Sequence, residues 1–194
     1  MKTEENAETK QILRLIYRNA DRLLKLVNQL LDFRKIDVQG DTLVLSTGDI
    51  VPFVRDVAYS FKELSEQKHI RFSFSSVFTS LPMRFDTDKV FKIVSNLLSN
   101  AFKFTPEGGM ITVTLSLLPD KEGRNKLLIE VSDSGIGIPA DKQEAIFDRF
   151  YQVSSSDKGN PVMGTGIGLH LCREFVRMHQ GSIAIKSQPG VGST

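Results

Sequence analysis

The pattern of apolar and polar residues predicts a long helix at the start of the chain. Between Gln11 and Ile36, apolar residues recur at alternating spacings of three and four, which is the seam of a coiled coil or helical bundle. The seam residues are Leu13, Ile16, Ala20, Leu23, Val27 and Leu30. Such a helix has nothing within its own segment to bury against. We expect a partner, either another helix or a second copy; packing on the following domain is the alternative.

A polar break at residues 37–41 separates this helix from a second pattern, in which short strands alternate with helices. We therefore expect residues 1–39 to form the helix and residues 40–194 to form a separate domain. The predicted strands span residues 43–46, 70–75, 83–85, 111–117, 126–132 and 182–187, and the predicted helices span residues 49–65, 86–104, 139–147 and a final segment that ends at Met178. We expect Asp49 to cap the first of these helices and His69 to lie in the turn before the strand at residues 70–75. A polar turn at residues 119–124 makes a hairpin of the strands on either side of it.

The helix predicted from Asp86 to Phe104 carries an unusual polar stripe. Asn96, Asn100 and Lys103 fall at positions i, i+4 and i+7 and therefore share one side of the helix. Asn is a poor residue for a helix interior, and such local conflicts tend to mark functional sites. An amide oxygen suits Mg²⁺, and a Lys one turn further suits phosphate. The alternative is a solvated polar face.

Composition and charge narrow the class of protein. The chain has 194 residues and a formal net charge of +2, so nothing favours nucleic acid or an anionic membrane as the main partner. The single cysteine and three scattered histidines form no disulfide framework and no transition-metal motif. No apolar run has the length of a membrane span, and the first ten residues do not resemble a signal peptide.

Two glycine-rich stretches are candidates for ligand binding. The first, Asp133-Ser-Gly135-Ile-Gly137, follows a predicted strand, so its carboxylate could accept from an exocyclic amine while the glycines allow close approach of a flat ligand. The second, Gly164-Thr-Gly166-Ile-Gly168, opens a helix, where free N–H groups favour anions. An Asx-type turn and tight helix packing are the respective alternatives.

A polar loop at residues 154–161 precedes the second glycine stretch, and a ligand could be covered by its closure. Phe147, Phe150 and Tyr151 border this loop, and they either anchor its base or cover a purine; for Phe147 core packing is the favoured interpretation. Phe104 is a further candidate for stacking on a base.

Taken together, the order and spacing of these stretches resemble the N, G1, F and G2 boxes of sensor histidine kinases, over nearly the whole chain. The resemblance implies an α+β fold of the Bergerat (GHKL) type, which is a two-layer α/β sandwich with helices on one face of a mixed sheet. The first helix resembles the second dimerisation helix of the family, and its Leu30–Lys35 end is similar to hybrid sensors.

The resemblance also implies roles for individual residues and the cofactors ATP and Mg²⁺. Asn100, assisted by Asn96, would hold Mg²⁺, Lys103 would contact phosphate, and Asp133 would accept from the adenine amine. Phe104 would contact the nucleotide, and residues 154–163 would form a lid over it. The nucleotide-facing backbone would come from Gly135, Gly137, Gly164, Thr165, Gly166, Gly168 and Leu169.

The chain departs from the family in two places. His69, His170 and His179 do not lie on the bundle helix, so we expect the phosphoacceptor His on a helix absent from this chain, and no autophosphorylation. The sequence also stops within a Gly-x-Gly-Ser motif, before the expected last strand. We further expect a response-regulator receiver domain as a partner, homodimerisation of the full-length protein, and a cytoplasmic position beside an inner-membrane anchor.

Three functions are compatible with this sequence. The first is the catalytic domain of a histidine kinase, which transfers the γ-phosphoryl group of ATP to a His. The second is a related ATP hydrolase, but those enzymes carry a Glu as general base where Asn96 stands here, and an amide cannot take the proton. The third is a non-catalytic dimerising module with a relict pocket.

Overall fold

The computed structural model describes residues 2–39, 42–119, 123, 125–152 and 165–194. The chain divides into two compact units, Met1–Asp41 and Thr42–Thr194. The first unit consists of one helix, α1 (Lys2–Gln39), which is longer at both ends than the predicted Gln11–Ile36. Most of its large apolar side chains, including those of Leu13, Leu23 and Leu30, are exposed. Within the described residues, no helix combines the length and apolar character that a bilayer span requires.

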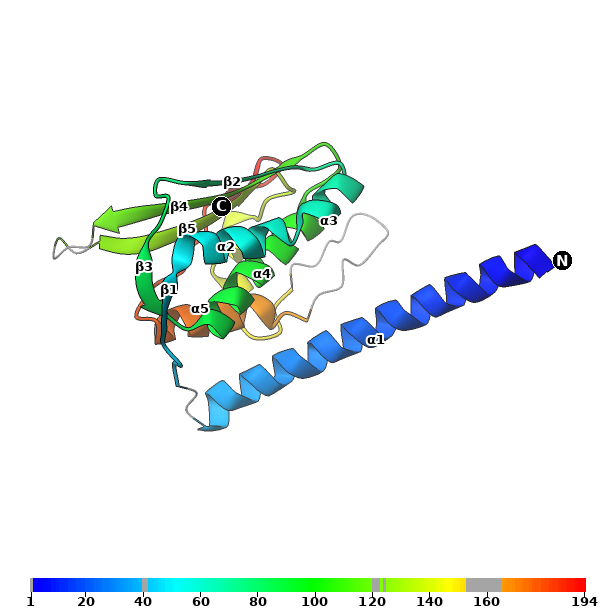
Figure 1. The fold of residues 1–194 in the computed structure, drawn as a ribbon, viewed down its shortest axis with the longest axis horizontal. Coiled ribbons are helices and arrows are strands. Elements are labelled where there is room, and N and C mark those ends of the chain that lie inside the picture. Colours follow the sequence, from blue (N-terminus) through cyan, green and yellow to red (C-terminus); the bar gives the residue numbers. More distant parts are fainter. Residues whose placement is uncertain (1, 40–41, 120–122, 124, 153–164) are drawn as a thin grey trace. The chain divides into compact units, whose positions relative to one another are not determined.

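The described part of the second unit contains a five-stranded mixed sheet in the order β2-β4-β5-β7-β6. Figure 1 shows β2, β4 and β5 side by side in this sheet. Its strands are β2 (Arg71–Ser76), β4 (Met110–Pro119), β5 (Asn125–Asp133), β6 (Ser187–Gln188) and β7 (Gly192–Ser193). Strands β2 and β4 run parallel, whereas the other neighbours are antiparallel.

The helices of the second unit are α2 (Ile50–Tyr59), α3 (Lys62–Gln67), α4 (Thr87–Phe104) and α5 (Gly168–Met178). Helices α2, α4 and α5 lie on the same side of the sheet (Figure 1). Strand β4 alternates accordingly: Ile111, Val113 and Leu115 are fully buried toward the helices. On its other face, Thr112 and Thr114 hydrogen-bond to serine hydroxyls of β2. The predicted two-layer α/β sandwich is therefore confirmed.

The core between the layers is formed mainly by α2, α4 and β4. Phe102 of α4 is 1% exposed and lies against Phe61 and Phe72, with ring centroids 5.6 and 5.5 Å away. A separate two-stranded sheet joins β1 (Ser46–Asp49) to β3 (Pro82–Phe85). Asp49 caps α2, because its carboxylate accepts from the Val51 N–H at 3.0 Å, as the sequence predicted.

Two predictions in the first half of this unit were wrong. The strand predicted at residues 43–46 is displaced, because β1 begins only at Ser46. The helix predicted from Asp49 to Ser65 is two helices, and the break falls at Ser60 and Phe61. The Ser60 hydroxyl donates to the Val57 carbonyl at 2.7 Å, and the Phe61 ring stacks on Phe102. A tertiary contact of the ring thus accompanies the end of α2.

Two predictions in the second half were also wrong. Residues 139–147 form two short 3₁₀ turns, Ala140–Lys142 and Ala145–Phe147, rather than one helix. The Gln143 side chain between them donates to the carbonyls of Ile138 and Ser187. The strand predicted at residues 182–187 shrinks to β6, Ser187–Gln188, whose hydrogen-bonded partner β7 spans only Gly192–Ser193.

Candidate functional site

The predicted polar stripe lies on one side of helix α4 in the structure. Asp86 begins the helix by accepting from the Lys89 N–H at 3.0 Å, and apolar residues such as Val94 and Leu98 turn into the core. This orientation leaves Asn96, Asn100 and Lys103 half-buried at the edge of the helix layer. The Lys103 ammonium lies over the Phe104 ring, 4.8 Å from its centroid. The side chains of the stripe are thus partly exposed to solvent and partly buried, which suits residues that bind a ligand.

Asp133 ends β5 on the face of the sheet that carries the helices. It pairs with Ile111 in the register and shares the face of Val131 and Ile129. Its carboxylate accepts from the Gly135 N–H at 2.8 Å. Burial raises the pKa of this carboxyl above its ordinary value of 3.8, although backbone N–H groups of Gly135 and Ser193 oppose the shift. A carboxylate that has lost part of its hydration is stabilised when a ligand N–H donates a hydrogen bond to it.

The loop after Asp133 packs on the end of α4. The Ile136 N–H donates to the Phe104 carbonyl at 3.3 Å, and a Cβ atom at Gly135 would come within 2.7 Å of that carbonyl oxygen. At Gly137, φ is +68° and a Cβ atom would meet the Gln188 carbonyl oxygen. These glycines therefore permit close approach of protein segments and bring Asp133 next to the last turn of α4.

The start of α5 packs on the middle of α4. A Cβ atom at Gly168 would lie 2.7 Å from the Asn96 Oδ1 atom, so the two predicted boxes meet at this point. Thr165 accepts from the Ile167 N–H through its hydroxyl, and Leu169 is half-buried. Cys172 is fully buried one turn further, and burial raises the pKa of its thiol to about 12. Gly164 and the predicted lid, residues 154–163, lie outside the described residues.

The segment before the predicted lid is anchored from two sides. Phe147 is buried, in agreement with the core packing favoured from the sequence, whereas Phe150 is 61% exposed. The Phe150 N–H donates to the Gly166 carbonyl at 3.0 Å, and a Cβ atom at Gly166 would collide with the Phe150 backbone. The Arg149 side chain donates to the buried ring of His170 in α5. Both contacts join this segment to the start of α5.

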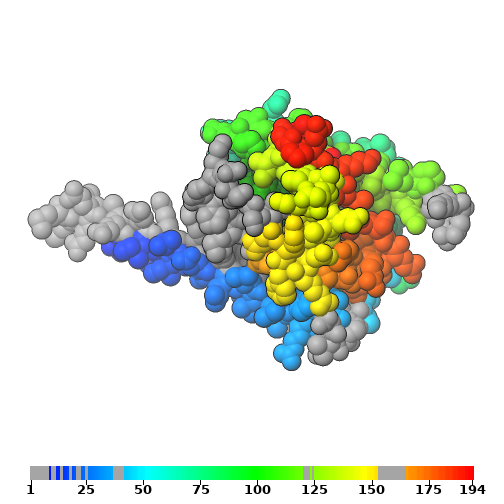
Figure 2. Space-filling view, turned by 180° about the vertical axis from the view of Figure 1, so that it is seen from behind, coloured from blue at the N-terminus to red at the C-terminus, as the bar shows by residue number. Residues whose placement is uncertain are grey.

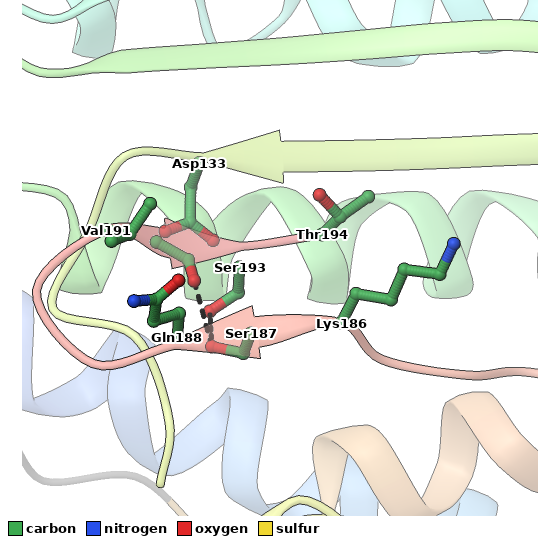
Figure 3. A pocket seen from close by; sticks show the side chains of 8 residues that line it. Asp133, Lys186, Ser187, Gln188, Val191, Ser193 and Thr194 are labelled. Atoms are coloured by element: carbon green, nitrogen blue, oxygen red, sulfur yellow. Dashed lines mark hydrogen bonds between the residues drawn. The ribbon is translucent and has the colours of Figure 1, made fainter. Parts of the chain in front are cut away.

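A hollow of ≈ 370 Å³ opens beside Asp133 (Figure 3). The turn and strands of the β6–β7 hairpin line the rest of it. Ser187 organises this wall, because its hydroxyl contacts the Gly192 carbonyl and the Ser193 hydroxyl, both at 2.9 Å, and accepts from the Ile138 N–H. Figure 2 shows the C-terminal residues, in red, beside the residues that follow β5, in yellow.

Sequence reasoning did not identify Ser187 or Ser193 as candidates. The available signal was the Gly-x-Gly-Ser pattern at Gly190–Ser193, because such a turn returns the chain to a strand. The predicted stripe on α4, by contrast, lies where expected. Among the described residues, no three His, Cys, Asp or Glu side chains gather in a way that could hold a metal ion. Asn96 and Asn100 present amide oxygens on α4, which are ligands of suitable chemistry for Mg²⁺.

Comparisons with known proteins agree with this architecture. A family model described as "Histidine kinase-, DNA gyrase B-, and HSP90-like ATPase" matches residues 85–194. Sensor histidine kinase TmoS of Ectopseudomonas mendocina is 40% identical over 179 residues, which are 92% of this chain and 18% of TmoS. Hybrid signal transduction histidine kinase D of Dictyostelium discoideum is 37% identical over 187 residues, which are 94% of this chain and 12% of that protein.

Among solved structures, full-length ShkA in complex with AMPPNP has a TM-score of 0.77 and 27% identity, covering 91% of this chain and 35% of ShkA. The chain spans less than a fifth of the length of the two curated relatives. The family match covers α4, the Asp133 loop, α5 and the β6–β7 hairpin, which are the elements that build the candidate site. The chain therefore belongs to the histidine kinase-, DNA gyrase B- and HSP90-like ATPase family, and its second unit is an ATP-binding catalytic domain of the sensor histidine kinase type.

Proposed function

We propose that this domain binds ATP with Mg²⁺ and transfers the γ-phosphoryl group to a histidine on a helix outside these 194 residues. The observation that carries the proposal is the convergence of three parts: the polar stripe of α4, the Asp133 loop packed on its last turn, and the start of α5 packed on Asn96. Phosphoryl transfer needs positioning and charge neutralisation more than covalent chemistry by the protein.

Asp133 recognises the base in this proposal. Its carboxylate accepts from the Gly135 N–H at 2.8 Å and retains further acceptor capacity for the exocyclic amine of adenine. Burial increases the strength of such a bond, because the local dielectric is low. Ile136 lies in the same loop, and its N–H donates to the carbonyl of Phe104, the second candidate for contact with the base. The Ile136 side chain is 61% exposed, so it offers an apolar surface to a purine ring.

The stripe on α4 receives the phosphates. Asn100, with Asn96 beside it, would hold Mg²⁺ through an amide oxygen, and this ion would neutralise phosphate charge when bound. Lys103 adds a cation one turn beyond Asn100. The backbone of Gly135, Gly137, Thr165, Gly166, Gly168 and Leu169 faces the nucleotide, and the start of α5 supplies N–H groups that the Ile167 side chain does not cap.

The proposal distinguishes the chain from ATP hydrolases of the same family. The Asn96 amide cannot act as a general base for water. The three histidines are also poorly placed as acceptors: His69 is exposed in a turn, as predicted, His170 is buried in α5, and His179 ends α5. We infer that the acceptor imidazole itself is the nucleophile and that this chain is not its own substrate.

The partners follow from the same proposal. The acceptor helix would pair with α1, whose exposed apolar stripe also suits dimerisation of the full-length protein. A response-regulator receiver domain would take the phosphoryl group from the histidine. The domain would work on the cytoplasmic side of the membrane, with the parent protein anchored in that membrane.

Calorimetric titration of ATP with Mg²⁺ tests nucleotide binding. We expect Asp133→Asn to weaken binding at least tenfold, because a hydrogen bond to a charged group contributes about 1.5–3 kcal/mol. Asp141→Asn, at an exposed carboxylate, is the matched control and should leave affinity unchanged. Because the pKa of Asp133 is raised, affinity should also fall on acidification at a pH above 3.8. A folded parent chain that binds no ATP would overturn the proposal.

Incubation with γ-labelled ATP tests the direction of transfer. We expect no covalent label on this chain, because none of its three histidines lies on the bundle helix, and phosphate release near background, because the Asn96 amide cannot act as a general base. Stable incorporation of label would contradict the first expectation. Rapid release of phosphate that Asn96→Ala abolishes would instead favour an ATP hydrolase.

A further inference from the structure

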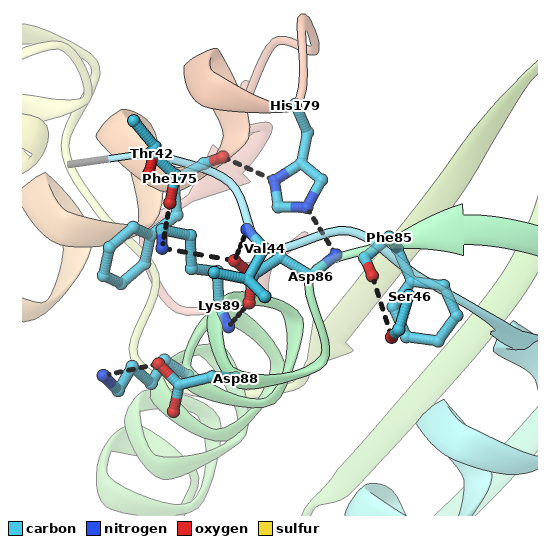
Figure 4. Close-up of polar contacts among 10 residues, drawn as sticks. Thr42, Val44, Ser46, Phe85, Asp86, Asp88, Lys89, Phe175 and His179 are labelled. Carbon is cyan, nitrogen blue, oxygen red and sulfur yellow. Dashed lines mark hydrogen bonds and ion pairs between the residues drawn. The ribbon is translucent and has the colours of Figure 1, made fainter.

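The first turn of α4 contains a buried ion pair away from the candidate nucleotide site (Figure 4). The Lys89 ammonium lies 3.2 Å from the Asp86 carboxylate, and the two side chains are only 7% and 4% exposed. Buried charges of this kind are uncommon and need several hydrogen bonds to offset their desolvation. Lys89 precedes Asn100 by three helical turns, so the pair does not contact the phosphate-binding stripe.

Both charges bind the backbone of residues 42–44, where the second unit begins. The Asp86 carboxylate accepts from the Val44 N–H at 2.9 Å, and the Lys89 ammonium donates to the Thr42 carbonyl at 3.2 Å. Apolar burial adds only part of this attachment: Leu43 is half-buried, whereas the side chains of Val44 and Leu45 are 76% and 40% exposed. The two polar contacts hold the backbone of this segment on both sides of Leu43.

The end of α5 completes the arrangement. The Asp86 N–H donates to the His179 Nε2 atom at 3.2 Å, so that nitrogen is the unprotonated one. His179 Nδ1 then carries the proton and donates to the Phe175 carbonyl at 2.8 Å. Figure 4 shows the segment, α4 and the end of α5 meeting around Asp86.

We propose that Asp86, Lys89 and His179 form a latch that anchors the chain to the ATP-binding domain at Thr42–Val44. While the latch is closed, the connection to α1 joins the domain at Thr42. Its release would add residues 42–45 to that connection, which is about 13 Å of additional reach at full extension. The anchoring does not depend on nucleotide binding; its importance for delivering phosphate to a distant histidine rests on the function proposed above.

Amide hydrogen exchange tests the latch directly. In Lys89→Met, we expect the Val44 amide to exchange at least tenfold faster, because the charge that holds Asp86 and the segment is lost. Affinity for ATP should stay within twofold of the parent. Lys92→Met is the matched control: Lys92 pairs with Asp88 at 2.8 Å and approaches the same Phe175 ring at 5.9 Å, and none of these contacts involves residues 42–44.

Unchanged exchange of Val44 in a folded Lys89→Met protein would overturn the proposal, as would equal acceleration in Lys92→Met. If Lys89→Met does not fold, the parent chain decides: exchange of its Val44 amide at the rate of an open coil would overturn the latch, and protection of tenfold or more would support it. Loss of protection in Lys89→Met together with no ATP binding by the parent would support the latch and reject only the proposed function.

Discussion

Helices α1 and α4 are both amphipathic, yet their apolar faces have different surroundings. In α4, Val94, Leu98 and Phe102 are at most 1% exposed, because α2 and β4 cover them. In α1, Leu13, Leu23 and Leu30 are between 54% and 65% exposed. The same periodicity thus predicts a helix in both cases but does not identify the partner. An apolar stripe indicates that one face of a helix is stabilised by burial, but the covering partner can be another part of the fold or another chain.

The largest expected effect is the difference in unfolding free energy between a substitution on the apolar face of α4 and one on that of α1. Phe102→Ala should lower the unfolding free energy of the second unit by about 3–5 kcal/mol, because it opens a cavity beneath Phe61 and Phe72. Leu23→Ala should change it by less than about 0.5 kcal/mol, since that side chain is 65% exposed. Urea unfolding followed by near-ultraviolet circular dichroism measures both values.

If Leu23→Ala destabilises the second unit as much as Phe102→Ala, the contrast between a covered and an exposed face is wrong. Sedimentation of the same proteins sharpens the contrast further. Should α1 pair with a second copy, Leu23→Ala will reduce self-association while Phe102→Ala will not do so in the folded protein.

A smaller effect concerns the charge at the start of α4. Burial alone would raise the pKa of Asp86, but hydrogen bonds from the Lys89 and Val44 N–H groups and the Lys89 ammonium outweigh it and lower the pKa below 3.8. Its contribution to stability is therefore complete above about pH 4 and is lost as the pH falls through the lowered value. The apolar stripe of α1 has no such titration.

The measurement is the difference in unfolding free energy between the parent and Asp86→Asn as the pH is lowered from neutral. We expect a constant difference down to about pH 4 and a decrease below it. A difference that instead grows on acidification would mean that Asp86 has a raised pKa and that its ion pair does not stabilise the fold.

The smallest expected effect lies where α4 meets α5. Gly168→Ala would place a Cβ atom 2.7 Å from the Asn96 Oδ1 atom and should weaken ATP binding about threefold to tenfold by displacing that amide. Gly48→Ala is the control, because its Cβ atom would make ordinary contact with the Phe85 ring at 3.5 Å. Equal affinities of the two variants would mean that the position of Asn96 does not matter for binding.

The sequence alone determined the elements with strong local signals. The stripe on α4, the hairpin of β4 and β5, and the capping of α2 and α4 by Asp49 and Asp86 all follow from side-chain period and cap chemistry. The order of the glycine-rich stretches was sufficient to indicate the family, because a spacing pattern over many residues is rarely accidental.

Only the tertiary structure decided features that depend on partners distant in sequence. The end of α2 at Ser60, the two 3₁₀ turns after Pro139 and the short β6 coincide with contacts to Phe102, Ser187 and β7, which local propensity does not include. The same holds for the contact of Gly168 with Asn96 and for the latch at Asp86. Local chemistry determines the helix or strand that each segment forms. The free energy of contacts between distant segments, by contrast, depends on which side chains the tertiary fold brings together.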